Sequence, residues 1–467
     1  MTASLHTTIE TMLVLLLIIF VVTLVARRAR VPYTIALVVT GLLGFEPGFR
    51  NIELTPDLIL TLFLPLLLFE GAYNVSARSL WRDLLPVTLL AIPGVLFSTI
   101  VTAALIHLLL GLGWVVAFLF GALIASTDPI AVVSLFRDLG VPRRLALLVE
   151  GESLFNDGAA ITLFSILLTV GLTGQIDVVS GLLGFLITVG GALLVGAAIG
   201  TAGSLLLRAV DNAQIQITTT VIAAYGAYLL AEHFGFSGAI AVVLTGLLFG
   251  NYGATNGLSL RSLHALNATW EFLGFVANAL IFLLIGIALD PRQLVTFAGP
   301  IAVAFLATLL GRTVAVYGLM PLLRGAQQIP RRFRPILVWG GLRGAVSLAL
   351  VLSIPQQVAN GQAFPNRALL QVLAFGVVAV SLLLQGLSMP LLIRTLDLAQ
   401  TPAATDEQPL LKARLHAVED ALLALGYEHD QGNIGSLPYE RLAQSYRRER
   451  AQLEQQLRAL DTPSASE

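Results

Sequence analysis

The residues with the clearest chemical potential are a few polar side chains inside long apolar runs. Segment 150–158 carries Glu152, Ser153, Asn156 and Asp157. In a helix, residues four apart lie on one face, so these four side chains form one polar stripe. Carboxylate, hydroxyl and amide oxygens are the ligands that a hard cation prefers, and a partly dehydrated carboxyl group readily takes up a proton instead. The stripe predicts a site where a small cation and a proton replace each other; the alternative is a buried polar stripe that only joins helices.

A second group surrounds Asp128 in segment 121–130. Pro129 removes a backbone donor and disfavours helical geometry at the residue before it. We therefore expect the helix to break near the middle of the membrane. Such a break leaves carbonyl oxygens that can bind a cation, and half-helix ends that carry partial charges. The alternative is a kink with a purely structural role.

Three more charged residues interrupt apolar runs. Arg312 lies well inside run 295–323, and Arg343 lies in the glycine-rich segment 340–344. Charges within a membrane span are costly, which makes them candidates for function. Glu70 lies near the end of run 56–73, where a site and an interfacial position are equally compatible with the sequence.

The composition explains which elements must hold these groups. The 467 residues are 56% hydrophobic and 12% charged, against about 25% charged residues in soluble domains. This predicts an all-α polytopic membrane protein. The chain has no cysteine, which excludes disulfides, thiol catalysis and zinc–thiolate sites. We find no basic patch for nucleic acid and expect no cofactor. The first arginines follow the first apolar run, which is not typical of a signal peptide.

Thirteen apolar runs approach the roughly 20 residues that a span requires. They lie near 9–26, 32–49, 56–73, 83–110, 114–136, 144–171, 178–207, 214–233, 236–252, 264–289, 295–323, 335–355 and 366–396. With the N-terminus outside, fifteen arginines lie on the cytoplasmic side and three, Arg50, Arg292 and Arg367, lie outside. The first apolar run is followed by Arg27, Arg28 and Arg30 on the cytoplasmic side. An odd number of spans then places the tail, 401–467, in the cytoplasm as two amphipathic helices after a linker at 402–406.

The transmembrane region, 1–400, is expected to contain an inverted repeat. Spans seven apart run in opposite directions, so spans 1–6 and 8–13 can be inverted halves joined by span 7. The fifth span is broken at Asp128-Pro129, and its repeat mate, the twelfth, is broken at 340–344.

Several motifs, taken in order, resemble the monovalent cation:proton antiporter family, which includes bacterial sodium–proton antiporters and animal sodium–hydrogen exchangers. They are Gly121–Pro129, Leu139–Pro142, Glu150–Gly158, Phe282–Gly286 and Gly341–Val346, and the resemblance covers roughly residues 56–396. It implies a core transport bundle, 83–171 and 295–396, in which the two broken helices cross. It also implies that helices in 1–73 and 178–289 mediate dimerisation, so that the protein is a homodimer. The implied role is pH regulation at the plasma (inner) membrane, by transport and not by an enzymatic activity.

The resemblance also implies roles for single residues. Asp157 is expected to carry the cation or the proton, and Ser153 and the Thr127 carbonyl to help bind Na+, with Asp128 close by. Glu70 matches an acid at the cation site of bacterial members. Glu152 is expected to form a structural ion pair with Arg312 or, as the alternative, Arg343. Asn156 before Asp157 resembles the branch that exchanges one proton per cation.

Three readings compete with Na+/H+ exchange. The sequence does not distinguish Na+ from Li+ or K+, so a K+-selective cation/proton antiporter stays an alternative. A cation channel also uses broken helices and acidic groups. An intramembrane aspartyl protease needs two aspartates, but no Gly-x-Gly-Asp sequence occurs.

Overall fold

The chain forms two compact units, Met1–Leu398 and Ala399–Glu467. The computed structural model describes residues 2–29, 31–43, 55–174, 178–210, 212–253, 258, 260–358, 361–399, 407–430 and 434–461. Arg30, Arg50 and the expected linker at 402–406 lie outside these residues.

The described residues of the first unit form helices and their connections, and the one β-contact among them is an isolated bridge between Gln357 and Ala363. Its α-helices are α1 (Thr2–Ala29), α2 (Tyr33–Leu43), α3 (Leu64–Asn74), α4 (Ala77–Arg82), α5 (Leu84–Ala91), α6 (Pro93–Leu110), α7 (Trp114–Leu123), α8 (Ile130–Asp138), α9 (Arg143–Thr173), α10 (Val178–Ala209), α11 (Ala213–His233), α12 (Gly238–Leu248), α13 (Leu260–Ala288), α14 (Pro291–Thr296), α15 (Ala298–Leu319), α16 (Phe333–Trp339), α17 (Ala345–Leu352), α18 (Arg367–Val380) and α19 (Gly386–Thr395). One π-helical stretch adjoins each of α3, α12 and α18: Leu58–Phe63, Phe249–Gly253 and Ser381–Gln385.

Each of the thirteen expected spans overlaps at least one of these helices. Seven helical stretches of the described residues are long and apolar enough to cross a membrane, and four shorter apolar helices accompany them. The fourth expected span bends at Pro93, which follows Ile92 between α5 and α6. Proline cannot donate within a helix, so a bend there is expected. The all-α membrane fold predicted from composition is confirmed.

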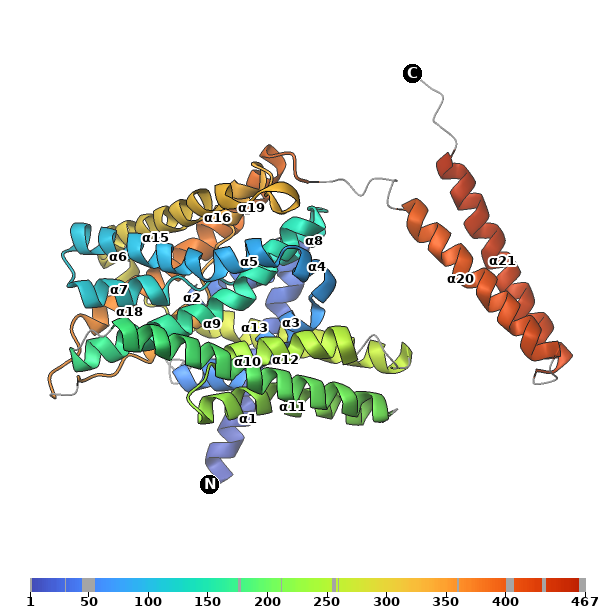
Figure 1. Cartoon of the computed structure of the whole chain (residues 1–467), viewed down its shortest axis with the longest axis horizontal. Coiled ribbons are helices and arrows are strands. Elements are labelled where there is room, and N and C mark those ends of the chain that lie inside the picture. The colour runs from blue at the N-terminus through green and yellow to red at the C-terminus, as the bar shows by residue number, and fades with distance from the viewer. Residues whose placement is uncertain are drawn as a thin grey trace, which may run out of the picture. The chain divides into compact units, whose positions relative to one another are not determined.

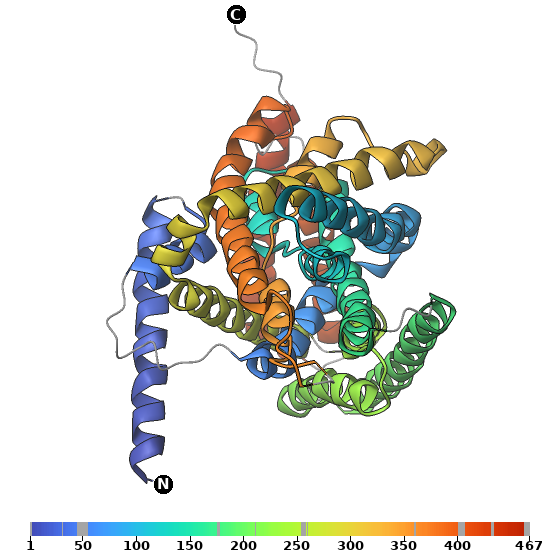
Figure 2. The same ribbon diagram turned by 90° about the vertical axis from the view of Figure 1, so that its left-hand side faces the viewer.

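The helices pack in two sets. One set brings α6 against α7 and α15, and α5 and α7 against α9 (Figure 1). The other set joins α10, α11 and α12 to one another, α12 to α3, and α13 to α2 (Figure 1). The end-on view of Figure 2 shows α1 at the edge of the bundle, and its contacts are with α2 and α13.

The two predicted breaks are present, and they lie against each other. The first separates α7 from α8 and contains Asp128; the second separates α16 from α17 and contains Leu342. The backbone N–H of Asp128 donates to the carbonyl oxygen of Leu342 at 2.8 Å. Gly344 is required at this contact, since a Cβ atom there would lie 2.6 Å from the Cβ of Asp128. The two breaks are thus joined by a backbone hydrogen bond inside the bundle.

The second unit is a helical hairpin of α20 (Glu407–Asp430) and α21 (Ser436–Asp461). Val418 and Leu425 of α20 are buried with Leu453 of α21. Leu423, a leucine of α20 two positions before Leu425, is 73% exposed. The partner helix selects the face around Val418 and Leu425, a choice that the spacing of leucines in one helix does not determine.

Candidate functional site

A cavity of about 90 Å³ lies beside the two breaks. Its polar lining comes from α3, the α7–α8 break and α9: Glu70, Ser126, Thr127, Asp128, Ser153 and Asp157. Its apolar lining includes Ile59, Ile281 and Val346. Two acids that are 29 residues apart in sequence, Asp128 and Asp157, therefore border one small space.

Asp157 is the acid of α9 that borders this cavity. Its side chain is buried, with 8% of the residue exposed. The hydroxyl of Ser126 donates to its Oδ1 at 2.5 Å. Sequence reasoning missed Ser126, although its place two residues before Asp128 in the broken segment was a usable signal. The contact holds the Asp157 carboxylate against the break and leaves its second oxygen without a described donor.

Ser153 and Asn156 tie the broken segment to α9. The Ser153 hydroxyl donates to the Thr127 carbonyl oxygen at 2.5 Å. The Asn156 amide donates to the Thr127 hydroxyl at 2.6 Å. Asn156 is fully buried and lies next to the cavity, not in its lining. Its geometry is that of a residue that positions Thr127, while Ser153 and Thr127 themselves line the cavity.

Glu152 forms its ion pair with Arg312. Both carboxylate oxygens accept from the Arg312 guanidinium, and the Nη2–Oε2 distance is 2.7 Å. Arg312 also donates from Nε and Nη2 to the Leu337 carbonyl oxygen, at 3.0 and 2.8 Å. Because Glu152 is 1% exposed, loss of either partner would leave a buried charge.

Arg343 has a different set of partners. Its Nη1 donates to the carbonyl oxygens of Ala125 and Ser126 at 2.7 and 3.1 Å. These carbonyls follow the C-terminal end of α7, where the helix dipole is negative and a cation is favourable. Arg343, which lies in the break between α16 and α17, thus stabilises the break between α7 and α8.

Glu70 is half-buried near the end of α3. It lines the cavity, and its Oε1 accepts from Asn74 at 2.9 Å. Gly274 of α13 makes room for it, since a Cβ atom there would lie 3.2 Å from its carboxyl carbon.

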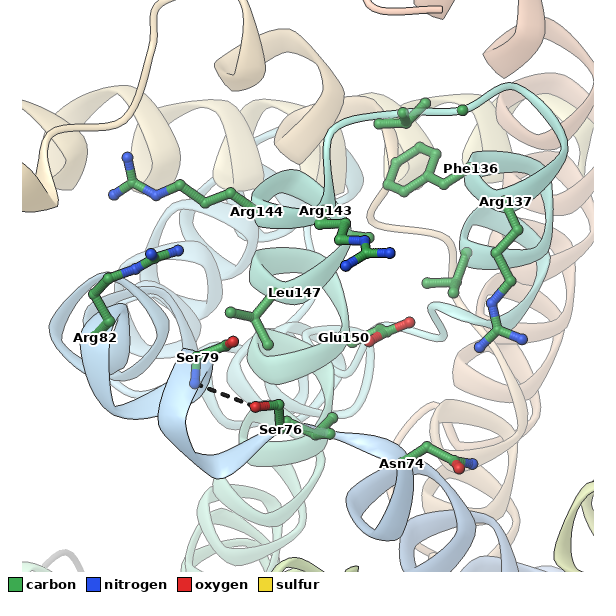
Figure 3. Close-up of a pocket in the computed structure, with 15 residues that line it drawn as sticks. Asn74, Ser76, Ser79, Arg82, Phe136, Arg137, Arg143, Arg144, Leu147 and Glu150 are labelled. Carbon is green, nitrogen blue, oxygen red and sulfur yellow. Dashed lines mark hydrogen bonds between the residues drawn. The ribbon is translucent and has the colours of Figure 1, made fainter. Parts of the chain in front are cut away.

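A second, wider pocket of about 470 Å³ opens near the cavity at the end of the bundle where α4, α8 and α9 meet. Figure 3 shows Glu150 inside it, with Arg137 and Arg143 on its walls and Asn74 below. Asn74 also borders the Glu70 side of the cavity through their hydrogen bond. The pocket and the cavity are thus linked by the hydrogen bond between Asn74 and Glu70.

One buried ion pair near this pocket was not predicted. Asp83 is 1% exposed and accepts from Arg144 Nη2 at 2.7 Å. Both residues lie at the ends of apolar runs, where a charged side chain is ordinarily expected in solvent, so the pair could not be predicted from the sequence pattern.

Acids and hydroxyls thus gather around a small cavity beside two broken helices. The family described as "Sodium/hydrogen exchanger, transmembrane" matches residues 15–395. The chain belongs to this sodium/hydrogen exchanger family. The resemblance found in the motifs is thereby confirmed.

Named relatives within the family cover most of the chain. The Na(+)/H(+) antiporter ApNhaP of Aphanothece halophytica is 39% identical over 399 residues, which are 85% of this chain and 75% of the relative. NhaS2 of Synechocystis sp. is 35% identical over 97% of this chain and 83% of its own length. The structure of the sodium proton antiporter MjNhaP1 from Methanocaldococcus jannaschii aligns with a TM-score of 0.69 at 20% identity, over 84% of this chain and 99% of that one. This last likeness supports the exchanger fold.

Proposed function

We propose that this exchanger-family chain is a secondary antiporter that exchanges Na+ for H+ across the membrane. The observation that carries the proposal is the cavity in which the buried Asp157 carboxylate faces Ser153 and the Thr127 carbonyl. The relatives ApNhaP and NhaS2 are named Na(+)/H(+) antiporters, which agrees with this chemistry.

In the proposed mechanism, Asp157 binds either the cation or a proton. The cation binds to Asp157, Ser153 and the Thr127 carbonyl oxygen, with Asp128 and Glu70 adding negative charge nearby. The Ser126 hydroxyl and Asn156 hold the carboxylate and Thr127 in position. Oxygen ligands of this kind suit a hard monovalent cation, and a proton on Asp157 removes the charge that the cation needs.

The wider organisation belongs to the same proposal. Helices α5–α9 and α15–α19 form the transport bundle, and α1–α3 with α10–α13 form the dimerisation part of a homodimer. The N-terminus lies outside the plasma membrane and the α20–α21 hairpin lies in the cytoplasm. The arginine distribution supports this orientation, because Arg78, Arg82, Arg137, Arg143 and Arg208 then all face the cytoplasm. The pocket of Figure 3 is the cytoplasmic access to the cavity.

The test of the proposed function is cation-driven proton movement in proteoliposomes. Addition of Na+ to vesicles with an internal pH dye should move protons in the opposite direction and saturate with concentration. Li+ and K+ tested in the same vesicles define the selectivity. Cation flux without proton movement, accompanied by conductance, would identify a channel and overturn the proposal.

Ser153→Ala should raise the KM for Na+ more than it lowers the maximum rate. The change removes one neutral oxygen ligand, and the expected increase in KM is roughly 2- to 10-fold, the range for losing one such polar contact. Ser165→Ala is the matched control, because Ser165 is on the same helix, is exposed, and its hydroxyl donates to the Ile161 carbonyl oxygen within its own helix. An unchanged KM in Ser153→Ala would remove Ser153 from the site.

Acid should inhibit exchange by raising the KM for Na+, since cation and proton compete for one carboxylate. Alkali should inhibit as well, because too few protons remain to load the return step. The measurement is the rate against pH at several Na+ concentrations, and the acid limb should move to lower pH as Na+ increases. An acid limb that stays in place would instead require a separate pH sensor.

The Asn156-Asp157 pair resembles the branch that exchanges one proton per cation, so the exchange should carry no net charge. A membrane potential set with valinomycin and K+ should therefore leave the rate unchanged. A strong response to the potential would mean more than one proton per cation.

A further inference from the structure

A groove with a different character lies on the lipid-facing side of the bundle. It has a volume of about 810 Å³ and runs between α4 and α9 on one side and α10 and α12 on the other. Its walls are mainly apolar: Leu80, Leu84, Phe155, Leu193, Ile240 and Leu244. None of its lining residues, all in the described part of the chain, is an acid.

The groove has the length of one membrane leaflet. Along α12 and the π-helical turn after it, the lining extends from Ile240 to Tyr252. Twelve residues of helix rise about 18 Å, which is close to half of the roughly 30 Å hydrocarbon core. The groove therefore runs from the end of the bundle to about the middle of the membrane, the depth that one acyl chain occupies.

The mouth of the groove combines aromatic rings with cations. Trp81 and Tyr252 line the mouth and are 73% and 63% exposed, as is typical of side chains at the membrane–water interface. Arg78 lines it too, and Arg208 lies over the Tyr252 ring, 5.3 Å from its centroid. Arg208 also donates to the Tyr252 carbonyl oxygen at 2.8 Å. Among the described residues, neither arginine forms an ion pair with a carboxylate.

The floor of the mouth is fixed by Asn251. Its side chain accepts from the Ala77 backbone N–H at 2.7 Å and donates to the Val75 carbonyl oxygen at 2.8 Å. These bonds hold the α3–α4 connection against the end of α12. The groove is thus a built feature of the fold, with a rigid base beneath its two arginines.

We infer that this groove binds one anionic phospholipid, with an acyl chain between α9, α10 and α12 and the phosphate headgroup at Arg78 and Arg208. An apolar groove open to the membrane must be filled by apolar groups, and an acyl chain of the adjoining leaflet has the required length. Since neither arginine pairs with a carboxylate among the described residues, both can attract a negatively charged headgroup, because each basic residue near the surface attracts anionic lipid.

The test uses the full-length protein in detergent, with phosphatidylglycerol and phosphatidylcholine as probes. Native mass spectrometry counts bound lipids, and thermal unfolding measures the stabilisation that follows binding to the folded state. Phosphatidylglycerol should bind more tightly and raise the unfolding midpoint more. Arg78→Gln combined with Arg208→Gln should weaken phosphatidylglycerol binding roughly 30-fold, about 5-fold for each arginine, and remove its advantage over phosphatidylcholine.

Two further variants sharpen the test. Arg324→Gln combined with Arg331→Gln removes two exposed arginines outside the groove and should leave the lipid preference unchanged. Leu193→Trp should fill the groove and reduce binding of both lipids with no change in charge. The inference would be overturned if the two lipids stabilised the protein equally, or if both double-arginine variants lost the same amount of phosphatidylglycerol binding.

A Leu193→Trp protein that changes its oligomeric state would show that a second copy of the chain occupies the groove instead. Neither readout depends on transport, so the inference stands or fails separately from the proposed function.

Discussion

Asp157→Asn abolishes exchange in a protein that remains folded: this is the expected result with the largest effect on activity. In the proposed mechanism, Asp157 is the group that both substrates share. Asparagine has nearly the same shape, and its side-chain oxygen can still accept from Ser126, so the local packing should persist. It has neither the charge to bind a cation nor a carboxyl group to bind a proton.

The measurement is Na+-driven proton movement in proteoliposomes, alongside thermal unfolding of the purified variant. Asp397→Asn makes the same chemical change at an exposed acid, since its side chain is 92% exposed, and should retain the wild-type rate. Full exchange by a folded Asp157→Asn protein would disprove the mechanism, because another group would then have to carry the proton.

Glu152→Gln should have the largest effect on stability. The change leaves Arg312 charged and buried without a negative partner, with its bonds to the Leu337 carbonyl and one neutral amide oxygen in place of the carboxylate. Removing one partner of a buried ion pair costs roughly 3–5 kcal/mol in soluble proteins. The unfolding midpoint should therefore fall well below those of the wild type and of Asp157→Asn. An unaltered midpoint would contradict a stabilising role for the pair.

The partner can be tested with a second substitution. Glu152→Gln combined with Arg312→Gln removes both charges and should recover much of the lost stability. Glu152→Gln combined with Arg343→Gln should recover none, because Arg343 holds the carbonyls of Ala125 and Ser126 and not Glu152. Equal recovery in the two double variants would mean that the Glu152 charge is balanced by the bundle as a whole.

The sequence alone determined the membrane class, the spans and the two breaks. Lipid requires long apolar helices with paired backbone groups, so composition and run length carry that information directly. Pro129 and the glycines at 340–344 carry equally local information, because each acts on its own segment of backbone. The polar stripe of α9 followed from helical spacing alone.

Only the tertiary structure decided which of these groups meet. Two arginines were possible partners for Glu152, and the packing of α15 against α6 and α16 brings Arg312 to it. The contact between Ser126 and Asp157 and the burial of the Asp83–Arg144 pair depend on which helices are neighbours. The position of Glu70 in the cavity depends on how α3 lies beside α9 and α13. Periodicity states which face of a helix is polar, but a distance between two helices is set by side-chain packing across the whole bundle.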